Sequence, residues 1–574
     1  MSPAIPVTAA SNEFTVYRMQ QYDLHTVPHG CRSASINLEG RSLRSWSTSR
    51  HCVVARIQDL TIEQFMEIRS KAGALLLVLP KNSTILTAEE KEHIQLLEMA
   101  MSQQEINIPV YFVPWSSEME DILSDLQFSF ITDDKAGTAL EAVINTVSSN
   151  GYQIDGQSTP CLGLNPIKDH KRLVFIGGAA DIELYVLSAV VTAPTPHKLD
   201  SKPVTLHARL PGRAGADTIV IAAHYDSSAI VPELSTGADS NASGAAALLE
   251  LARVFSRLYA GAATRGAPTL LFLLTPTGRA LNYFSAKRWL EEQLDTADSA
   301  VLQDVSFVLC LDSLSGEGAP TLHVSKPPRA GGAIDSLRAR LRSPLRHKKI
   351  NLADELLAWQ HERFSIRRMA ACTLSAQPSP GAAARGSVLD RPAGAAAARL
   401  AGAVRAVARA LASHIYNLTD ADGDSDGRLY DDALDVDEAS VRHWYWYLSS
   451  QPRAPHVVTT GGPNSGMHLK KIYVFYLFTS CAPWFHPREF RNSHTNSKRA
   501  LRTTHAPDAR DPDYALYGPT RATLYVYSVK PAVFDLVLTL AIAAYLALLY
   551  FAMQLFPRFY AEFAKLVTRK TKVQ

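Results

Sequence analysis

Four polar residues stand where buried strands are expected to end, and they are of the types that hold catalytic metal ions. His224 and Asp226 follow the apolar run TIVIAA, Asp239 lies in the loop GADSN, and Asp312 follows VSFVLCL. In a two-metal hydrolytic site, such groups surround ions ~3.5–4 Å apart, one carboxylate bridges them, and another carboxylate takes a proton from the bound water. The sequence therefore contains about half of the groups that metal-assisted hydrolysis needs.

The spacing of these residues resembles that of the zinc exopeptidases with an aminopeptidase fold. In those enzymes the histidine of an HxD motif binds one metal, the aspartate of that motif orients it, and the aspartate of a GAxxNxSG loop bridges both ions. His224, Asp226 and Asp239 match these positions, and Asp312 matches a later aspartate ligand. The resemblance also implies two adjacent glutamates after the next buried strand, the first as general base, and a last histidine ligand before the C-terminal helix.

Those glutamates and that histidine are absent where the resemblance places them. Thr-Pro-Thr at residues 275–277 follows the buried run TLLFLL, and the next acidic residue is Glu291. Ser375 and Ala376 stand where the histidine should fall, and His361 lies in a helical pattern, where a histidine is more often structural than a ligand. Loss of a general base typically costs ~10²–10⁴ in rate. We therefore predict a pseudoenzyme of the zinc aminopeptidase fold, with no catalytic residue, no bound metal and no other cofactor.

The remaining residues of this relict metal site have structural uses as well. Asp239 and Asn241 can cap the helix that begins nearby, and Gly244 allows that helix to pack closely on the sheet. Besides a scaffold, two functions stay open at this point. One is a membrane-bound metallo-aminopeptidase with an unusual site, and the other is a module that binds peptides in the relict cleft.

Buried strands that alternate with helices predict the framework that positions these residues. Over residues 204–420 this alternation is typical of a doubly wound sheet, which gathers polar residues at the carboxyl ends of its strands. A similar alternation over 51–150 predicts a smaller α/β domain, with an N-terminal segment over 1–50 and a connecting region over 151–203. The stretch SPGAAARGSVLDRPAG after Pro378 is interpreted as a linker. The expected fold is an aminopeptidase-like doubly wound α/β sheet with a smaller N-terminal α/β domain and one C-terminal transmembrane helix.

One apolar run near the C-terminus predicts the membrane span. Residues 536–556 carry no charge, and as a helix this run rises about 31 Å, which matches a bilayer core of roughly 30 Å. We place the transmembrane helix at 531–557 and a basic tail at 558–574, and a basic tail of this kind should stay in the cytosol. Residues 421–530 are interpreted as an acidic linker and a lumenal extension.

Three glycosylation sequons, at Asn82, Asn241 and Asn417, favour a lumenal body. The start of the chain, MSPAIPVTAASNEF, has no basic region followed by an apolar run and is not a recognisable signal peptide. Taken alone, that start and the C-terminal span would describe a tail-anchored protein whose body faces the cytosol.

Calcium, disulfide and nucleic-acid functions receive little support. The run DADGDSDG at residues 420–427 resembles a calcium loop, but Ala433 stands where a bidentate glutamate is needed. The six cysteines lie far apart, so that a Cys31–Cys52 bridge and buried free thiols both remain open. The formal charge is only +3 and the basic residues are scattered, so no nucleic-acid partner is expected.

Several stretches outside the site resemble the nicalin family, a nicastrin-related group. They include EFTVYRMQQYDL, LLELARVFSRLY, LHVSKPPR and VKPAVFDL, whereas residues 455–510 depart from the family. The resemblance implies a single-pass type I glycoprotein of the endoplasmic reticulum membrane, anchored in the bilayer, with its large domain in the lumen. It also implies a non-catalytic scaffold that works with the Nodal modulator protein, a small multi-spanning membrane protein and the Sec translocon. The expected roles are insertion of multi-pass membrane proteins and restraint of Nodal signalling.

Overall fold

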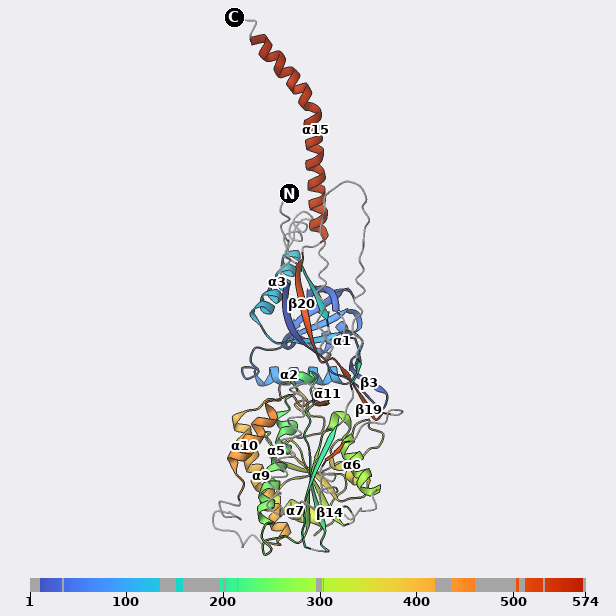
Figure 1. The fold of residues 1–574 in the computed structure, drawn as a ribbon, viewed down its shortest axis with the longest axis vertical. Helices are drawn as coiled ribbons and strands as arrows, with labels where there is room; N and C mark the ends of the chain where they lie inside the picture. The colour runs from blue at the N-terminus through green and yellow to red at the C-terminus, as the bar shows by residue number, and fades with distance from the viewer. Residues whose placement is uncertain are drawn as a thin grey trace, which may run out of the picture.

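The chain folds into two β-sheet bodies stacked along one long axis, with a helix that projects from one end (Figure 1). The structure is a computed structural model, and it describes residues 11–33, 36–134, 151–157, 197–199, 203–213, 215–295, 302, 304–418, 435–459, 502–504, 512–529 and 532–570. The calcium-loop-like run at 420–427 lies outside the described residues.

The larger body contains an eight-stranded sheet. Its strands, in spatial order, are β16 (Leu345–His347), β15 (Thr321–Val324), β17 (Ala371–Ser375), β14 (Val305–Leu311), β12 (Thr218–His224), β13 (Thr269–Thr275), β11 (Val204–Leu210) and β18 (Arg502–Thr504). The central strands β17, β14, β12 and β13 run parallel, and β15 and β11 join them antiparallel. Parallel strands are usually buried on both faces, which explains why these sequences are nearly continuous apolar runs.

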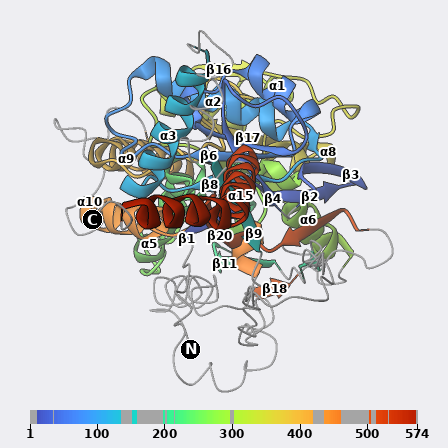
Figure 2. The same cartoon turned by 90° about the horizontal axis from the view of Figure 1, so that it is seen from above.

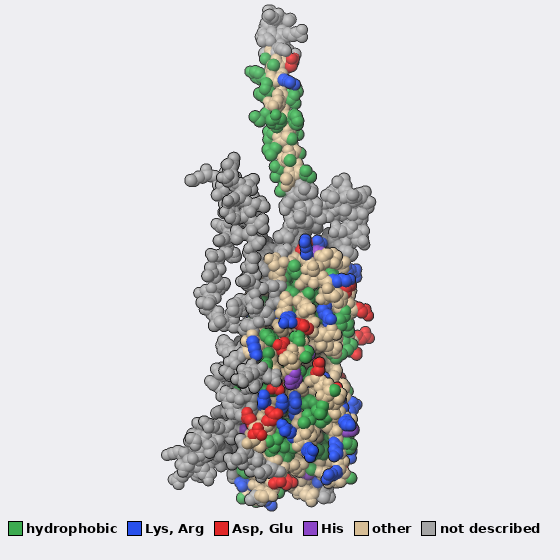
Figure 3. All heavy atoms as spheres, turned by 90° about the vertical axis from the view of Figure 1, so that its right-hand side faces the viewer, with side chains coloured by type: hydrophobic (Ala, Val, Ile, Leu, Met, Phe, Trp, Pro, Cys, Tyr) green, Lys and Arg blue, Asp and Glu red, His purple; other side chains and the backbone are tan. Residues whose placement is uncertain are grey.

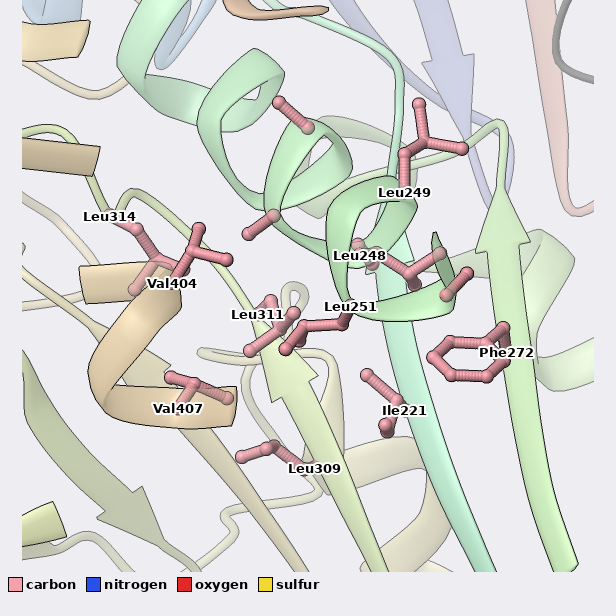
Figure 4. Packing of buried hydrophobic residues seen from close by; sticks show 14 of the residues in the cluster. Ile221, Leu248, Leu249, Leu251, Phe272, Leu309, Leu311, Leu314, Val404 and Val407 are labelled. Atoms are coloured by element: carbon pink, nitrogen blue, oxygen red, sulfur yellow. The ribbon is translucent and has the colours of Figure 1, made fainter. Parts of the chain in front are cut away.

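Helices cover both faces of this sheet. One face carries α5 (Gly244–Leu258), α7 (Ala333–Leu341), α9 (Gly394–Ile415) and α10 (Glu438–Ser449), and the other carries α6 (Phe284–Asp295) and α8 (His361–Ile366). Successive residues of β12 divide between these faces. Ile221 belongs to the cluster of Leu248 and Val404 (Figure 4), whereas Val220 belongs to the cluster of Trp289 and Phe364. The sheet thus fixes the strand ends from which the candidate site projects.

The smaller body is a closed barrel. Its strands, in order, are β1 (Ser11–Arg18), β20 (Arg521–Val529), β9 (Gly151–Gln157), β4 (Ile36–Ser42), β5 (His51–Arg56), β6 (Ala74–Val78) and β8 (Val110–Val113). Its helices are η1 (Ile57–Asp59), α1 (Ile62–Lys71), α2 (Ala88–Ser102) and α3 (Ser117–Asp134). Capping boxes start α1 at Thr61 and α2 at Thr87. Strands from 11–42, 151–157 and 521–529 therefore complete a body that we expected to span only 51–150.

A second, five-stranded sheet lies beside the barrel, and the two bodies share a core. The strands of this sheet are β10 (His197–Lys198), β19 (Tyr514–Gly518), β2 (Gln21–Leu24), β3 (Val27–Cys31) and β7 (Glu105–Ile106). Ile230 of the larger body packs into the hydrophobic cluster of the barrel, and its carbonyl accepts the Gln20 N–H at 2.8 Å. The Val388 N–H donates to Oε1 of Glu98 on α2 at 3.1 Å. These contacts join the bodies directly rather than through a linker.

The described parts of residues 421–530 are built into the fold, which corrects their interpretation as a linker and extension. α10, the short helix α11 (Pro455–Thr459), β19 and β20 all fall in this segment. Arg453, between α10 and α11, is buried and donates hydrogen bonds of 2.8 Å to the carbonyls of Thr236 and Gly237. Sequence periodicity missed this role because the partners lie more than two hundred residues away.

The C-terminal helix α15 (Ala532–Lys570) projects from the barrel end of the molecule. Its residues 538–564 form the one helix among the described residues that is long and apolar enough to span a membrane. Apolar side chains cover it along this stretch (Figure 3). The helix continues beyond the expected end at residue 557 and bends along its course (Figure 2). Pro557 lies inside it, and a proline lacks the N–H and crowds the preceding turn, which accounts for a bend.

Of the two alternatives for Cys31 and Cys52, the structure has buried free thiols. The two residues belong to different hydrophobic clusters of the barrel, so a bridge between them is not formed. Cys310 and Cys372 are likewise buried and free.

Candidate functional site

His224 and Asp226 form a buried pair at the end of β12. Nδ1 of His224 lies 2.9 Å from Oδ1 of Asp226, and the Gly278 N–H donates to Oδ2 of Asp226 at 2.7 Å. Asp226 thus accepts at both oxygens, which assigns the donor role to Nδ1 and leaves Nε2 as an acceptor in the neutral ring. Nε2 is buried with no hydrogen-bond partner among the described residues.

Asp239 lies in the short helix η3 (Ala238–Ser243) that leads into α5. Its Oδ1 atom accepts from the N–H and the hydroxyl of Ser315 at 2.9 and 2.8 Å, and its Oδ2 atom accepts from Nε2 of Gln377 at 2.8 Å. Neutral donors from two neighbouring loops therefore engage both oxygens of this carboxylate.

Asp390 holds the backbone of the same short helix. Its two oxygens accept the backbone N–H groups of Asp239 and Ser240 at 2.8 and 3.0 Å. Burial and then the negative charge of Asp239 raise the pKa of Asp390 to about 7. The position of Asp239 thus depends on a second carboxyl group that the sequence analysis did not single out.

Asp312, which follows β14, is paired with a cation. Arg385 donates to its Oδ2 atom, and the two side chains are 6% and 2% exposed, respectively. Nη2 of Arg385 also donates to the Tyr283 hydroxyl at 3.2 Å, and the guanidinium lies 4.9 Å from the ring centroid of Trp359. Burial opposes the charge of Arg385, yet the Asp312 carboxylate raises the pKa of Arg385 above its usual value. A side chain therefore supplies the positive charge beside Asp312.

The turn after β13 offers no carboxylate. The Thr275 hydroxyl accepts from Nε2 of Gln360 at 3.0 Å, and the Thr277 hydroxyl accepts the Ser285 N–H at 2.8 Å. Gly278 follows, and a Cβ atom there would lie 2.7 Å from Nδ1 of His224. This turn accommodates a side chain at residue 278 only if His224 moves.

Asn241 is an interior structural residue, which corrects its prediction as a glycosylation site. It is 0% exposed, and its Nδ2 atom donates to the carbonyls of His224 and Leu311 at 3.0 Å each. Its Oδ1 atom accepts the N–H groups of Gly244 and Ser313 at 3.0 and 3.1 Å. A glycan would need the same Nδ2 atom and open space beside it. Asn241 instead ties β12 and β14 to the start of α5.

The other two sequon asparagines lie on the surface. Asn82 is exposed, and its Oδ1 atom accepts from the N–H and the hydroxyl of Thr84 at 2.9 and 2.8 Å. Asn417 is exposed just beyond α9. Both positions leave room for a sugar.

His361 is a buried structural histidine. Its Nδ1 atom lies 2.8 Å from the Thr373 hydroxyl and its Nε2 atom 2.9 Å from the Ser325 hydroxyl. Burial and the nearby His323 lower the pKa of His361 to about 3. Both nitrogens are thus engaged with hydroxyl groups.

A cavity of about 420 Å³ opens next to His224, between the two bodies. The larger body lines it with His224, Asp226, Arg279 and Arg385, and the barrel body lines it with groups that include Glu98 of α2. Burial raises the pKa of Glu98 to about 7. The cavity therefore combines titratable groups from both bodies.

The residues present do not fit the zinc pair of the aminopeptidase fold. No group of three or more His, Cys, Asp or Glu side chains that could hold a metal ion occurs in the described part of the chain. Asp239 is engaged by Ser315 and Gln377, and Asp312 is engaged by Arg385. A metal at Asp312 would have to displace a buried guanidinium, which costs more than binding at an open site.

Comparisons with known proteins agree with this fold. The model of Peptidase family M28 matches residues 205–275. The crystal structure of the gamma-secretase component nicastrin covers 90% of this chain and 100% of its own, with a TM-score of 0.53 at 10% identity. Fold and site thus define a protein of the aminopeptidase-like class with a nicastrin-like architecture, as expected from the sequence.

Relatives at higher identity give the particular family. The mouse protein named BOS complex subunit NCLN is 35% identical over 589 residues, which cover 100% of this chain and 94% of that protein. The protein named Nicalin from Caenorhabditis elegans is 28% identical over 94% of this chain and 89% of that protein. The chain belongs to the nicalin family, and the resemblance noted in the sequence is confirmed.

Sequence patterns did not reveal the groups that surround Asp239 and Asp312. Gln377, Arg385 and Asp390 all lie in or beside the stretch that was interpreted as a linker. The one available signal was the presence of Arg385 and Asp390 among small residues, because a charged residue in an apolar loop often marks a buried pair.

Proposed function

We propose that this chain is a non-catalytic subunit of a membrane protein complex at the endoplasmic reticulum. The observation that carries the proposal is the pairing of Asp312 with Arg385, in a site that also lacks a carboxylate after β13. A hydrolytic site needs an open metal position and a base. Here Arg385 neutralises Asp312, and the hydroxyl groups of Thr275 and Thr277 stand where the base would be. The fold then serves to hold neighbouring proteins.

Membership of a complex is supported by the names of the relatives. The mouse protein is called a BOS complex subunit, and it aligns with the whole of this chain. The partners we propose are the Nodal modulator protein and a small multi-spanning membrane protein, with the Sec translocon beside them. In that setting the chain would assist insertion of multi-pass membrane proteins and restrain Nodal signalling.

The proposed topology is single-pass type I, with the two bodies in the lumen. Residues 538–564 are long and apolar enough to span the bilayer; Arg558 lies within the last turns of that stretch, and Lys565, Arg569 and Lys570 follow it. Basic residues next to a span favour the cytosolic side. The exposed sequons at Asn82 and Asn417 would then face the glycosylation machinery.

Affinity purification in a mild detergent, followed by mass spectrometry, tests the proposed partners and the proposed topology. We expect the tagged full-length chain to recover translocon components and the two proposed partners, and to shift on a gel after endoglycosidase treatment. A chain whose residues 536–556 are replaced by an unrelated span serves as the matched control for anchoring. A body that is digested by protease added to intact microsomes, with none of these partners recovered, would contradict the proposal.

A further inference from the structure

Both basic and apolar side chains line the cavity beside His224. They include Arg279 and Arg385 on the one hand, and Leu24, Ile230 and Leu356 on the other. Its volume of about 420 Å³ falls in the range of ~300–1,000 Å³ that is usual for small-molecule sites. The space thus suits a ligand with one charged end and an apolar body.

Arg279 carries a positive charge that is not paired directly with a described acidic side chain. Its side chain forms no ion pair and donates no hydrogen bond to a described residue, and its Nε atom is buried without a partner. Burial, and then the charge of Arg385, lower the pKa of Arg279, and the charge of Asp312 offsets only part of this effect. Two guanidinium groups therefore repel each other at the edge of the same cavity. Arg279 is partly buried, and a bound anion would offset the cost of holding a partly desolvated cation without an ion-pair partner.

Arg385 has donor capacity left after its known contacts. Its Nη2 atom donates to Asp312 and Tyr283, but its Nη1 atom is buried with no hydrogen-bond partner among the described residues. The stacking of the guanidinium on Trp359 keeps its plane in a fixed orientation. A planar guanidinium of this kind matches the two oxygens of a carboxylate.

The same cavity also offers a hydrogen-bond acceptor. Nε2 of His224 is buried without a partner among the described residues, and His224 lines the cavity. By contrast, the oxygens of Asp226 already accept from His224 and Gly278. A ligand that satisfies the site therefore needs an anionic group for the arginines and an N–H group for His224. The last residues of a peptide carry both.

We propose that this cavity binds the free C-terminal end of a peptide, with the terminal carboxylate between Arg279 and Arg385. The last side chains lie against Leu24, Ile230 and Leu356, and an amide N–H group of the peptide donates to His224. Binding at this site involves no bond cleavage, and it does not depend on the complex proposed above.

Calorimetric titration of the full-length chain in mild detergent tests the proposal with acetyl-trialanine and its C-terminal amide. We expect saturable binding of the acid and binding of the amide that is weaker by about 10-fold or more, since hydrogen bonds to charged groups of ~1.5–3 kcal/mol correspond to roughly 10–100-fold in affinity. Arg279→Gln should weaken binding of the acid by a similar factor. Arg329→Gln, at an exposed arginine outside the cavity, should leave it unchanged. Equal affinity for acid and amide, an unaffected Arg279→Gln variant, or no saturation up to about 10 mM would each overturn the proposal. So would sodium acetate or inorganic phosphate that competes as well as the peptide.

The thermal stability of the same variants supplies a second readout. Because Arg279 has no partner to lose, we expect the Tm of Arg279→Gln in the absence of ligand to equal or exceed that of the unmodified chain. The acid should raise the Tm of the unmodified chain and leave that of Arg279→Gln unchanged. A marked fall in the Tm of Arg279→Gln would show that Arg279 stabilises the fold itself, which would contradict the proposal.

Discussion

Arg385 is paired with Asp312 in the interior of the larger body, with both side chains at most 6% exposed. The pair lies where the aminopeptidase resemblance places a metal ligand, so a cation from the chain itself neutralises a relict carboxylate. Trp359 and Tyr283 hold the guanidinium from its other sides. The pair explains how a carboxylate at this position is tolerated in the interior.

Removing the cation should destabilise the larger body. Arg385→Met leaves Asp312 as a buried charge without its partner, and loss of one member of a buried pair typically costs ~3–5 kcal/mol. We expect a clear fall in the unfolding temperature, measured by thermal denaturation of the detergent-solubilised chain. The double change Arg385→Met with Asp312→Leu should be less harmful than Arg385→Met alone. If the single change is neutral, the pair does not stabilise the site.

A methyl group at residue 278 should disturb His224. The Cβ of Gly278→Ala would lie 2.7 Å from Nδ1 of His224, so the imidazole or the turn must shift. Overpacking of this kind typically costs ~1–3 kcal/mol. Gly394→Ala is the matched control, because a Cβ there meets nothing within 4 Å. Thermal denaturation should show a lower unfolding temperature for Gly278→Ala only. Equal stability of the two variants would contradict the close approach of residue 278 to His224.

The stability of the interface between the bodies should depend on pH through Glu98. Burial raises the pKa of Glu98 to about 7 from its usual value of 4.5. A carboxyl group with a raised pKa contributes stability that is fully present below the unfolded pKa and is lost as the pH rises through the folded pKa. Glu98→Gln stays neutral, so its stability relative to the unmodified chain should rise between about pH 5 and pH 8 by roughly 1–3 kcal/mol.

Thermal denaturation across that pH range measures the effect of Glu98→Gln. Glu92→Gln, at an exposed position of the same helix, is the matched control and should show no such trend. A constant difference between Glu98→Gln and the unmodified chain would mean that Glu98 does not titrate in this range.

Glycans should occupy Asn82 and Asn417 but not Asn241. The Nδ2 atom of Asn241 is engaged by two carbonyls in the interior, whereas the other two asparagines are exposed. Mass spectrometry of the chain from microsomes should find the peptide with Asn241 unmodified. Asn82→Gln and Asn417→Gln should each remove one step of the endoglycosidase shift. A sugar on Asn241 would show that the interior packing around it is wrong.

The sequence predicted the framework of the site because its signals are local. Buried runs ending at His224 and Asp312 correspond to β12 and β14, and the helix that follows Asp239 corresponds to α5. The spacing and number of apolar residues within a short window are enough to predict such strands and helices. The same signals identified the membrane helix, although not its continuation past Pro557.

Contacts between distant segments could not be predicted in this way. Arg385 lies in an alanine- and glycine-rich stretch that has no periodicity, and its partner Asp312 is 73 residues away. Arg453 donates a hydrogen bond to the Gly237 carbonyl, in the loop before Asp239, from the segment 421–530 that we interpreted as a linker and extension. β1 pairs with β20 across almost the whole chain. One sequence alone contains no signal for pairings of this length.

The most direct test of the proposed non-catalytic role is a peptide-hydrolysis assay on the purified full-length chain with added zinc. An active aminopeptidase of family M28 measured in parallel provides the positive control. We predict no turnover above that of membranes that lack the chain, because Arg385 forms an ion pair with Asp312 and no carboxylate follows β13 to act as a base. Turnover that requires zinc and disappears in Asp239→Asn would contradict the proposal.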